Sequence, residues 1–137
     1  MVDAFTAASV AALFLRLGTG TVFVAHGFQK VLPEGAGIKV GRRHLTESIA
    51  GLGFPWPEVW AWAVTALQCL GGLLLILGVF TPVLAAALAL MMAVAAYEKG
   101  PQGFVLGADF PFSLLCALLA LVLLGEGRFS VAGLLAG

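Results

Sequence analysis

The chain has 137 residues, of which 61% are hydrophobic and only 10% are charged, and its net charge is zero. Soluble domains carry about 25% charged residues, so this composition and the mean hydropathy of +1.08 predict a membrane protein rather than a soluble one. Without an excess of basic residues there is also no electrostatic reason to expect a nucleic-acid partner.

Apolar segments predict an all-α fold, an integral membrane four-helix bundle in which residues 1–137 form one transmembrane domain. The helices are expected at about residues 4–31, 57–77, 82–97 and 110–124. An apolar helix of about 20 residues crosses the hydrocarbon core of a bilayer, so the last two segments are short and should gain a turn from their flanking residues. Gly78 as a C-cap and Pro82 in a first helical turn predict a tight hairpin between the second and third helices.

A short interfacial helix is predicted in the first loop, at about residues 44–52, because Leu45, Ile49 and Leu52 repeat at helical spacing. Basic residues gather on this side of the bundle: Lys30, Lys39, Arg42, Arg43 and Lys99. The opposite side holds only Arg128. The positive-inside rule therefore predicts a cytoplasmic first loop and places both termini outside.

Arg16 is the only ionisable side chain in the run Ala4–Ala25, and it lies near the middle of that run. An arginine at the bilayer centre costs roughly 2.5–3.5 kcal/mol on insertion scales, so it should face the protein interior and bond to a partner. Gln68 is the expected acceptor, at mid-depth in the second helix. The long arginine stem would also reach toward Glu126, and a bound anion, a lipid headgroup or a cofactor oxygen are further candidates. Alternatively, Gln68 and backbone carbonyls satisfy Arg16, which then only fixes helix packing.

His26 and Lys30 are four residues apart near the loop end of the first helix, on adjacent turns. They would suit an anionic or quinone-like headgroup or a proton relay, or they would simply anchor the helix at the interface. Together with Arg16 and Gln68 they form the candidate cofactor-binding site. No residue is assigned a catalytic role, and no spacing of histidine, cysteine and carboxylate residues fits a metal site.

One face of the first helix should pack inward, because Arg16, Gly20, Phe23, Gly27 and Lys30 point in one direction at 100° per residue. The two cysteines, Cys69 and Cys116, lie near the centres of separate apolar runs. They are predicted to be small apolar core residues rather than a redox pair, because thiolate chemistry needs a polar environment.

Several short motifs resemble those of the DoxX family of small four-helix membrane proteins. They are Leu15-Arg16-Leu17, Gly20-Thr21-Val22-Phe23, His26-Gly27-Phe28-Gln29-Lys30, Gly53-Phe54-Pro55, Gly71-Gly72 through Gly78, and the tail Gly125-Glu126-Gly127-Arg128-Phe129-Ser130. The resemblance implies a helical bundle in a prokaryotic cytoplasmic membrane. The family takes its name from a subunit of a quinone-linked thiosulfate oxidoreductase, and other members are linked to oxidative-stress defence as membrane partners of redox enzymes.

The chain departs from the family pattern at two positions. Family members usually carry Glu at the position of Gln68, and many carry Asp shortly after the serine that corresponds to Ser130, where this chain has Val131 and Ala132. The resemblance therefore implies that Arg16 lacks the counter-ion it has in relatives.

The leading hypothesis is a non-catalytic membrane subunit or quinone-interacting partner of a redox complex, rather than a stand-alone enzyme. The expected partners are the lipid bilayer and the subunits of a redox enzyme in sulfur or oxidative-stress metabolism, with a quinone as the candidate cofactor. One alternative is a small homo-oligomeric transporter or channel, in which Arg16 and Gln68 line a pathway for an anion. Another is a purely structural membrane scaffold without a ligand.

Overall fold

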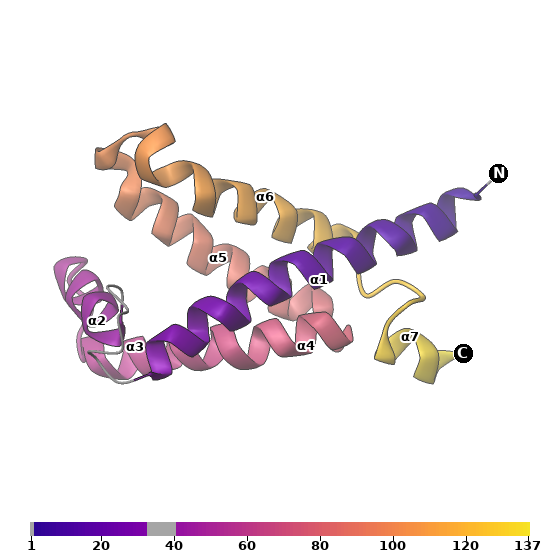
Figure 1. Cartoon of the computed structure of the whole chain (residues 1–137), viewed down its shortest axis with the longest axis horizontal. Helices are drawn as coiled ribbons and strands as arrows, with labels where there is room; N and C mark the ends of the chain where they lie inside the picture. The colour runs from indigo at the N-terminus through magenta and orange to yellow at the C-terminus, as the bar shows by residue number, and fades with distance from the viewer. Residues whose placement is uncertain (1, 33–40) are drawn as a thin grey trace.

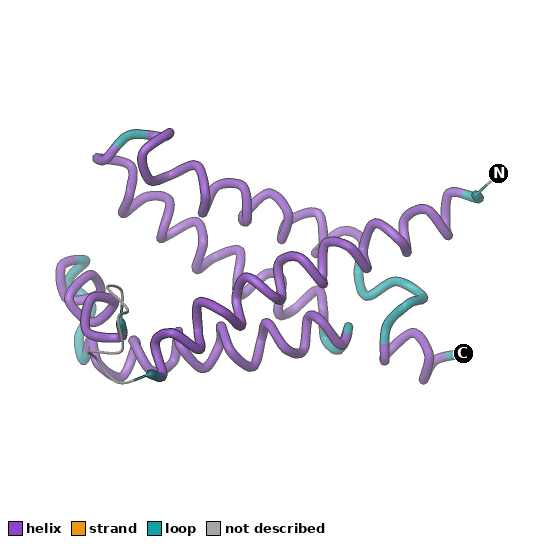
Figure 2. Tube along the Cα trace, in the orientation of Figure 1, coloured by secondary structure: helices purple, strands orange, loops and turns teal. Residues whose placement is uncertain are grey.

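The structure is a computed structural model that describes residues 2–32 and 41–137, and this part of the chain is all-α (Figures 1 and 2). Four stretches of helix are long and apolar enough to cross a membrane: Ala4–Val31, Pro57–Leu77, Thr81–Gln102 and Phe104–Leu124. The predicted fold class, an all-α protein with four membrane spans, is confirmed.

The first span is the single helix α1 (Ala4–Val31), whose N-cap Asp3 accepts a hydrogen bond from the backbone N–H of Thr6. The second span is built in three parts. These are α3 (Pro57–Ala66), the π-helical turn η1 (Leu67–Gly71) and α4 (Gly72–Leu77). Wider turns of this kind rotate the side chains that they carry relative to the rest of the helix.

The third and fourth spans form an antiparallel hairpin. Helix α5 (Thr81–Lys99) continues into the 3₁₀ turn η2 (Gly100–Gln102), and the π-helical turn η3 (Phe104–Ala108) leads into α6 (Asp109–Leu124). The two segments predicted at 82–97 and 110–124 are thus lengthened by the turns that flank them. Each span then has enough residues to cross the hydrocarbon core.

Two short helices lie at opposite ends of the bundle (Figure 1). Helix α2 (Arg42–Gly51) precedes the second span, and its Ile49 is buried. It begins two residues before the predicted interfacial segment 44–52, and the loop residues Glu34 and Lys39 lie outside the described residues. Helix α7 (Val131–Ala136) was not predicted, and it lies with both chain ends at the end away from α2 (Figure 1).

Glycine contacts bring α1 against the second span. A Cβ on Gly20 would lie 2.7 Å from the carbonyl oxygen of Gly72, and a Cβ on Gly27 would lie 2.6 Å from Sγ of Cys69. Only glycine lets the two backbones approach this closely. The predicted inward face of α1 is confirmed, because Arg16, Gly20, Phe23 and Gly27 are buried and Lys30 is half-buried.

Candidate functional site

The predicted site residues form two separate polar clusters rather than one, and His26 makes a third contact of its own. In the first, Arg16 is 1% exposed and bonds to the segment that follows α6. Its Nη1 donates to the carbonyl oxygen of Glu126 at 3.0 Å, and its Nη2 donates to that of Phe129 at 2.5 Å. The two terminal nitrogens of one guanidinium thus hold a single stretch of backbone.

Glycines bring the backbone to Arg16. Gly78, which caps α4 with a φ of 74°, packs so tightly against the guanidinium that a side chain at this position would overlap Nη1. Gly125 and Gly127 turn the chain after α6 with φ values of 72° and 74°. Because α4 and α6 both end at these glycines, Arg16 lies at the end of the bundle.

Arg16 therefore lies level with the ends of α4 and α6 rather than beside their middles, and the reason is the length of α1. A helix of 28 residues is about 42 Å long, whereas the 21-residue second span measures about 32 Å. The N-terminal turns of α1 extend beyond the neighbouring helices (Figure 1). The middle of α1 therefore coincides with the ends of α4 and α6.

Of the acceptors considered for Arg16, Gln68 is ruled out because it bonds to Lys30 instead, whereas backbone carbonyls do accept from the guanidinium. The reach toward Glu126 is confirmed, but the acceptor is the backbone carbonyl rather than the carboxylate. Within residues 2–32 and 41–137, the one ion pair is the exposed contact between Arg43 and Glu47. Arg16 is thus held by neutral carbonyl dipoles in this part of the chain.

The second cluster joins α1 to the π-helical turn of the second span. Nζ of Lys30 donates to Oε1 of Gln68 at 2.6 Å, and Gln68 is only 5% exposed. Gly27 lies against Gln68 and Cys69 without a side chain of its own. The π-helical turn, which often marks functional sites, carries Gln68 at this contact.

His26 links α1 to the α5–α6 hairpin. Its ring stacks on Phe110, with centroids 5.6 Å apart and an angle of 28° between the rings. Nδ1 lies 2.9 Å from the carbonyl oxygen of Val22. Since a carbonyl oxygen only accepts, Nδ1 carries a hydrogen and is the donor in this contact. His26 is exposed, so Nε2 is open to a ligand or to water.

The cysteines do not pair, and both thiols are free. Cys69 is half-buried beside Gln68, whereas Cys116 is exposed on α6, which corrects its prediction as a core residue. No group of three His, Cys, Asp or Glu side chains that would hold a metal ion lies in the described part of the chain.

Sequence patterning missed the structured tail. Ser130 accepts a hydrogen bond from the N–H of Gly133 at 2.8 Å and so caps α7. The N–H of Arg128 donates to Oγ of Ser9 at 3.3 Å, which ties the tail to α1. The signal available in the sequence was a serine cap after two closely spaced glycines.

The model of the DoxX family matches residues 11–98. This range includes Arg16, His26, Lys30 and Gln68, and it ends before α6 and the tail. No curated protein and no solved structure matches the chain.

Proposed function

The chain belongs to the DoxX family, and from this membership and the second polar cluster we propose that it is a non-catalytic membrane subunit of a redox complex that holds a quinone headgroup. The proposed headgroup site consists of Lys30, Gln68 and His26. Such a subunit would supply binding and orientation, while the redox enzyme that it accompanies would supply the electrons.

The hydrogen bond from Lys30 to Gln68 carries this proposal. An ammonium group has three N–H donors, and the amide oxygen of Gln68 takes one of them. A quinone carbonyl would accept from another donor, and its flat ring would suit the aromatic surface of His26 and Phe110. Ionisable side chains within spans are by default candidates for function, because their burial is costly.

We assign no ligand to Arg16, since its guanidinium already bonds to two carbonyl oxygens of the tail. This arrangement disfavours the alternative of an anion pathway. That pathway requires Arg16 and Gln68 to line one route, whereas the two side chains bond to different partners in different clusters. A scaffold without a ligand is the alternative that the experiment below has to exclude.

The proposed location is a prokaryotic cytoplasmic membrane, as the resemblance to the DoxX family implies. We place α2 on the cytoplasmic side and both termini outside, on the basis of the basic residues near α2. The headgroup site would then lie nearer the cytoplasmic face, since Lys30 is next to the last residue of α1.

The test is the quinone content of protein purified from native membranes with its surrounding lipid. Organic extraction and chromatography should give a quinone in stoichiometric amount for the unaltered chain, and Lys30→Met and Gln68→Leu should lose it. Lys99→Met removes an exposed lysine from the last turn of α5 and is the matched control. A chain that purifies without quinone and without any partner protein would contradict the proposal and favour the scaffold.

A further inference from the structure

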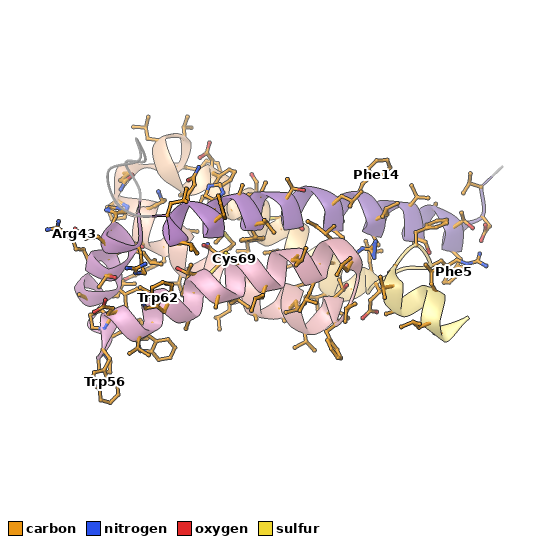
Figure 3. The ribbon with its side chains drawn as sticks, turned by 60° about the horizontal axis from the view of Figure 1, so that its bottom comes forward. Phe5, Phe14, Arg43, Trp56, Trp62 and Cys69 are labelled. Atoms are coloured by element: carbon orange, nitrogen blue, oxygen red, sulfur yellow. The ribbon has the colours of Figure 1, made fainter. Side chains whose placement is uncertain are left out.

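The end of the bundle that carries α2 presents arginines beside tryptophans. We call the set Arg42, Arg43, Trp56, Trp60 and Trp62 the Arg–Trp surface. Trp56 is 75% exposed, Trp60 47% and Trp62 46%. Figure 3 shows Arg43 and Trp56 pointing away from the helices at this end. Large exposed aromatic side chains of this kind are enriched where a bilayer meets water.

A cation–π contact positions Arg42. Its guanidinium carbon lies 4.0 Å from the centroid of the Trp62 ring. Stacking on a ring occupies the face of the guanidinium and leaves the N–H groups around its edge free to donate. The contact therefore fixes the direction of the donors, which lowers the entropy lost when they bind a planar or tetrahedral anion.

Within the described residues, Arg43 makes one weak side-chain contact. Its Nε donates to Oε1 of Glu47 at 3.3 Å, and the two side chains are 75% and 65% exposed. Exposed pairs of this kind contribute little, and both terminal nitrogens of Arg43 lie outside the contact. Helix α2 has no acidic residue in its first turn, whereas it has Arg42, Arg43 and His44 there.

The depth of these residues fits a lipid headgroup. Helix α2 lies between the end of the first span at Val31 and the start of the second at Pro57. Ile49 is buried and α2 packs against α3, so the basic first turn lies at the end of the bundle where the second span begins. Lipid phosphates lie beside the ends of membrane spans.

We propose that the Arg–Trp surface binds the headgroups of anionic phospholipids in the leaflet at the α2 end. The phosphodiester accepts charge-assisted hydrogen bonds from the edges of Arg42 and Arg43, and the tryptophans contact the glycerol and the upper acyl chains. Each basic residue near an anionic leaflet contributes about fivefold in binding, the equivalent of roughly 1 kcal/mol.

The opposite end supplies a matched control. The guanidinium of Arg128 lies 5.3 Å from the ring centroid of Phe5, so it too is an arginine over an aromatic ring. Arg128 has no second arginine next to it in the sequence, however, and the negative charge of the Asp3 carboxylate interacts with its guanidinium. The proposal therefore predicts lipid selectivity at the α2 end and none that depends on Arg128.

The experiment uses the full chain in nanodiscs of equal parts phosphatidylglycerol and phosphatidylcholine, followed by native mass spectrometry of the lipids that stay bound. We expect the unaltered chain to retain phosphatidylglycerol preferentially. The double variant Arg42→Gln and Arg43→Gln should reduce that preference by about 25-fold, a factor of about five for each arginine, whereas Arg128→Gln should leave it unchanged. Circular dichroism verifies that each variant keeps its helix content.

Two further measurements distinguish lipid binding at the Arg–Trp surface from binding of a free anion. Trp62→Leu keeps both arginines but removes the ring under Arg42, so the preference should fall by a smaller factor than in the double variant. Inorganic phosphate at millimolar concentration should not displace the bound lipid. Equal retention by the double variant, an equal loss with Arg128→Gln, or displacement by free phosphate would each overturn the proposal.

Discussion

Nη2 of Arg16 lies 2.5 Å from the carbonyl oxygen of Phe129, although 113 positions separate the two residues. The guanidinium also bonds to the carbonyl of Glu126, so one side chain in the middle of α1 fixes the whole segment between α6 and α7. Main-chain carbonyls are suitable partners here, because they accept from Nη1 and Nη2 without burying a second formal charge. Nε of Arg16 is buried and has no hydrogen-bond partner among the described residues. The C-terminal tail therefore depends on a residue of the first helix.

Removing the guanidinium should release the tail. Arg16→Met leaves two carbonyl oxygens without their donor, and each hydrogen bond to a charged group contributes about 1.5–3 kcal/mol. Local opening of the tail should then increase by at least about tenfold, which trypsin would detect as faster cleavage after the exposed Arg128. Cleavage after Arg43, at the opposite end, is the internal control. Equal rates at Arg128 in the two proteins would show that Arg16 does not hold the tail.

Two glycines of α1 should respond to the same substitution with opposite signs. Gly20→Ala places a Cβ 2.7 Å from the carbonyl oxygen of Gly72, and since backbone cannot yield easily, we expect a loss of about 1–3 kcal/mol. Gly18 has nothing within 4 Å of such a Cβ, so Gly18→Ala should gain up to about 1 kcal/mol from helix propensity. Thermal unfolding in detergent, followed by circular dichroism, measures both. A stabilising Gly20→Ala would mean that α1 and α4 are farther apart.

Gln68 should matter to stability through Lys30 and not through Arg16. Gln68→Leu deprives the Lys30 ammonium of its acceptor, and a buried unsatisfied group costs about 1–3 kcal/mol, more when it is charged. Gln68→Glu, which places a carboxylate beside the ammonium group, should keep the contact as an ion pair. Combining Gln68→Leu with Lys30→Met should recover much of the lost stability. Full additivity of the two substitutions would instead show that the side chains are not coupled.

Sequence patterning could predict the spans and the inward face of α1, because both depend on periodicities that a bilayer imposes. For Arg16 it offered Gln68, Glu126 and backbone carbonyls as partners, but it could not choose between them. The choice between Gln68 and the tail depends on how far α1 extends past the other helices, and on the π-helical turn that carries Gln68 toward Lys30. Contacts of this kind depend on the relative shift of whole helices, which no local pattern in the chain encodes.

The first turn of α1 should loosen in acid. The hydroxyl of Thr6, and then its backbone N–H, hydrogen-bond to the Asp3 carboxylate and lower the pKa of this carboxyl below its ordinary value of 3.8. Because the folded value is the lower one, the cap stabilises the helix fully above pH 3.8 and is lost as the pH falls through the folded pKa. The amide chemical shift of Thr6 should follow this titration. Asp3→Asn keeps an acceptor without a charge, so in this variant the amide chemical shift of Thr6 should not change with pH.

The orientation of the bundle can be tested at its two ends, because exposed residues are available at each. Reporter cysteines are placed at Glu47 on α2, whose side chain is 65% exposed, and at Leu135 on α7, which is 83% exposed. Cys69 and Cys116 are first replaced by serine, since both thiols are free. With α2 in the cytoplasm, a membrane-impermeant maleimide added to intact cells should label Leu135→Cys and spare Glu47→Cys until the membrane is permeabilised. The reverse pattern would place the basic end outside, and the site of Lys30 and Gln68 would then open toward an extracytoplasmic partner.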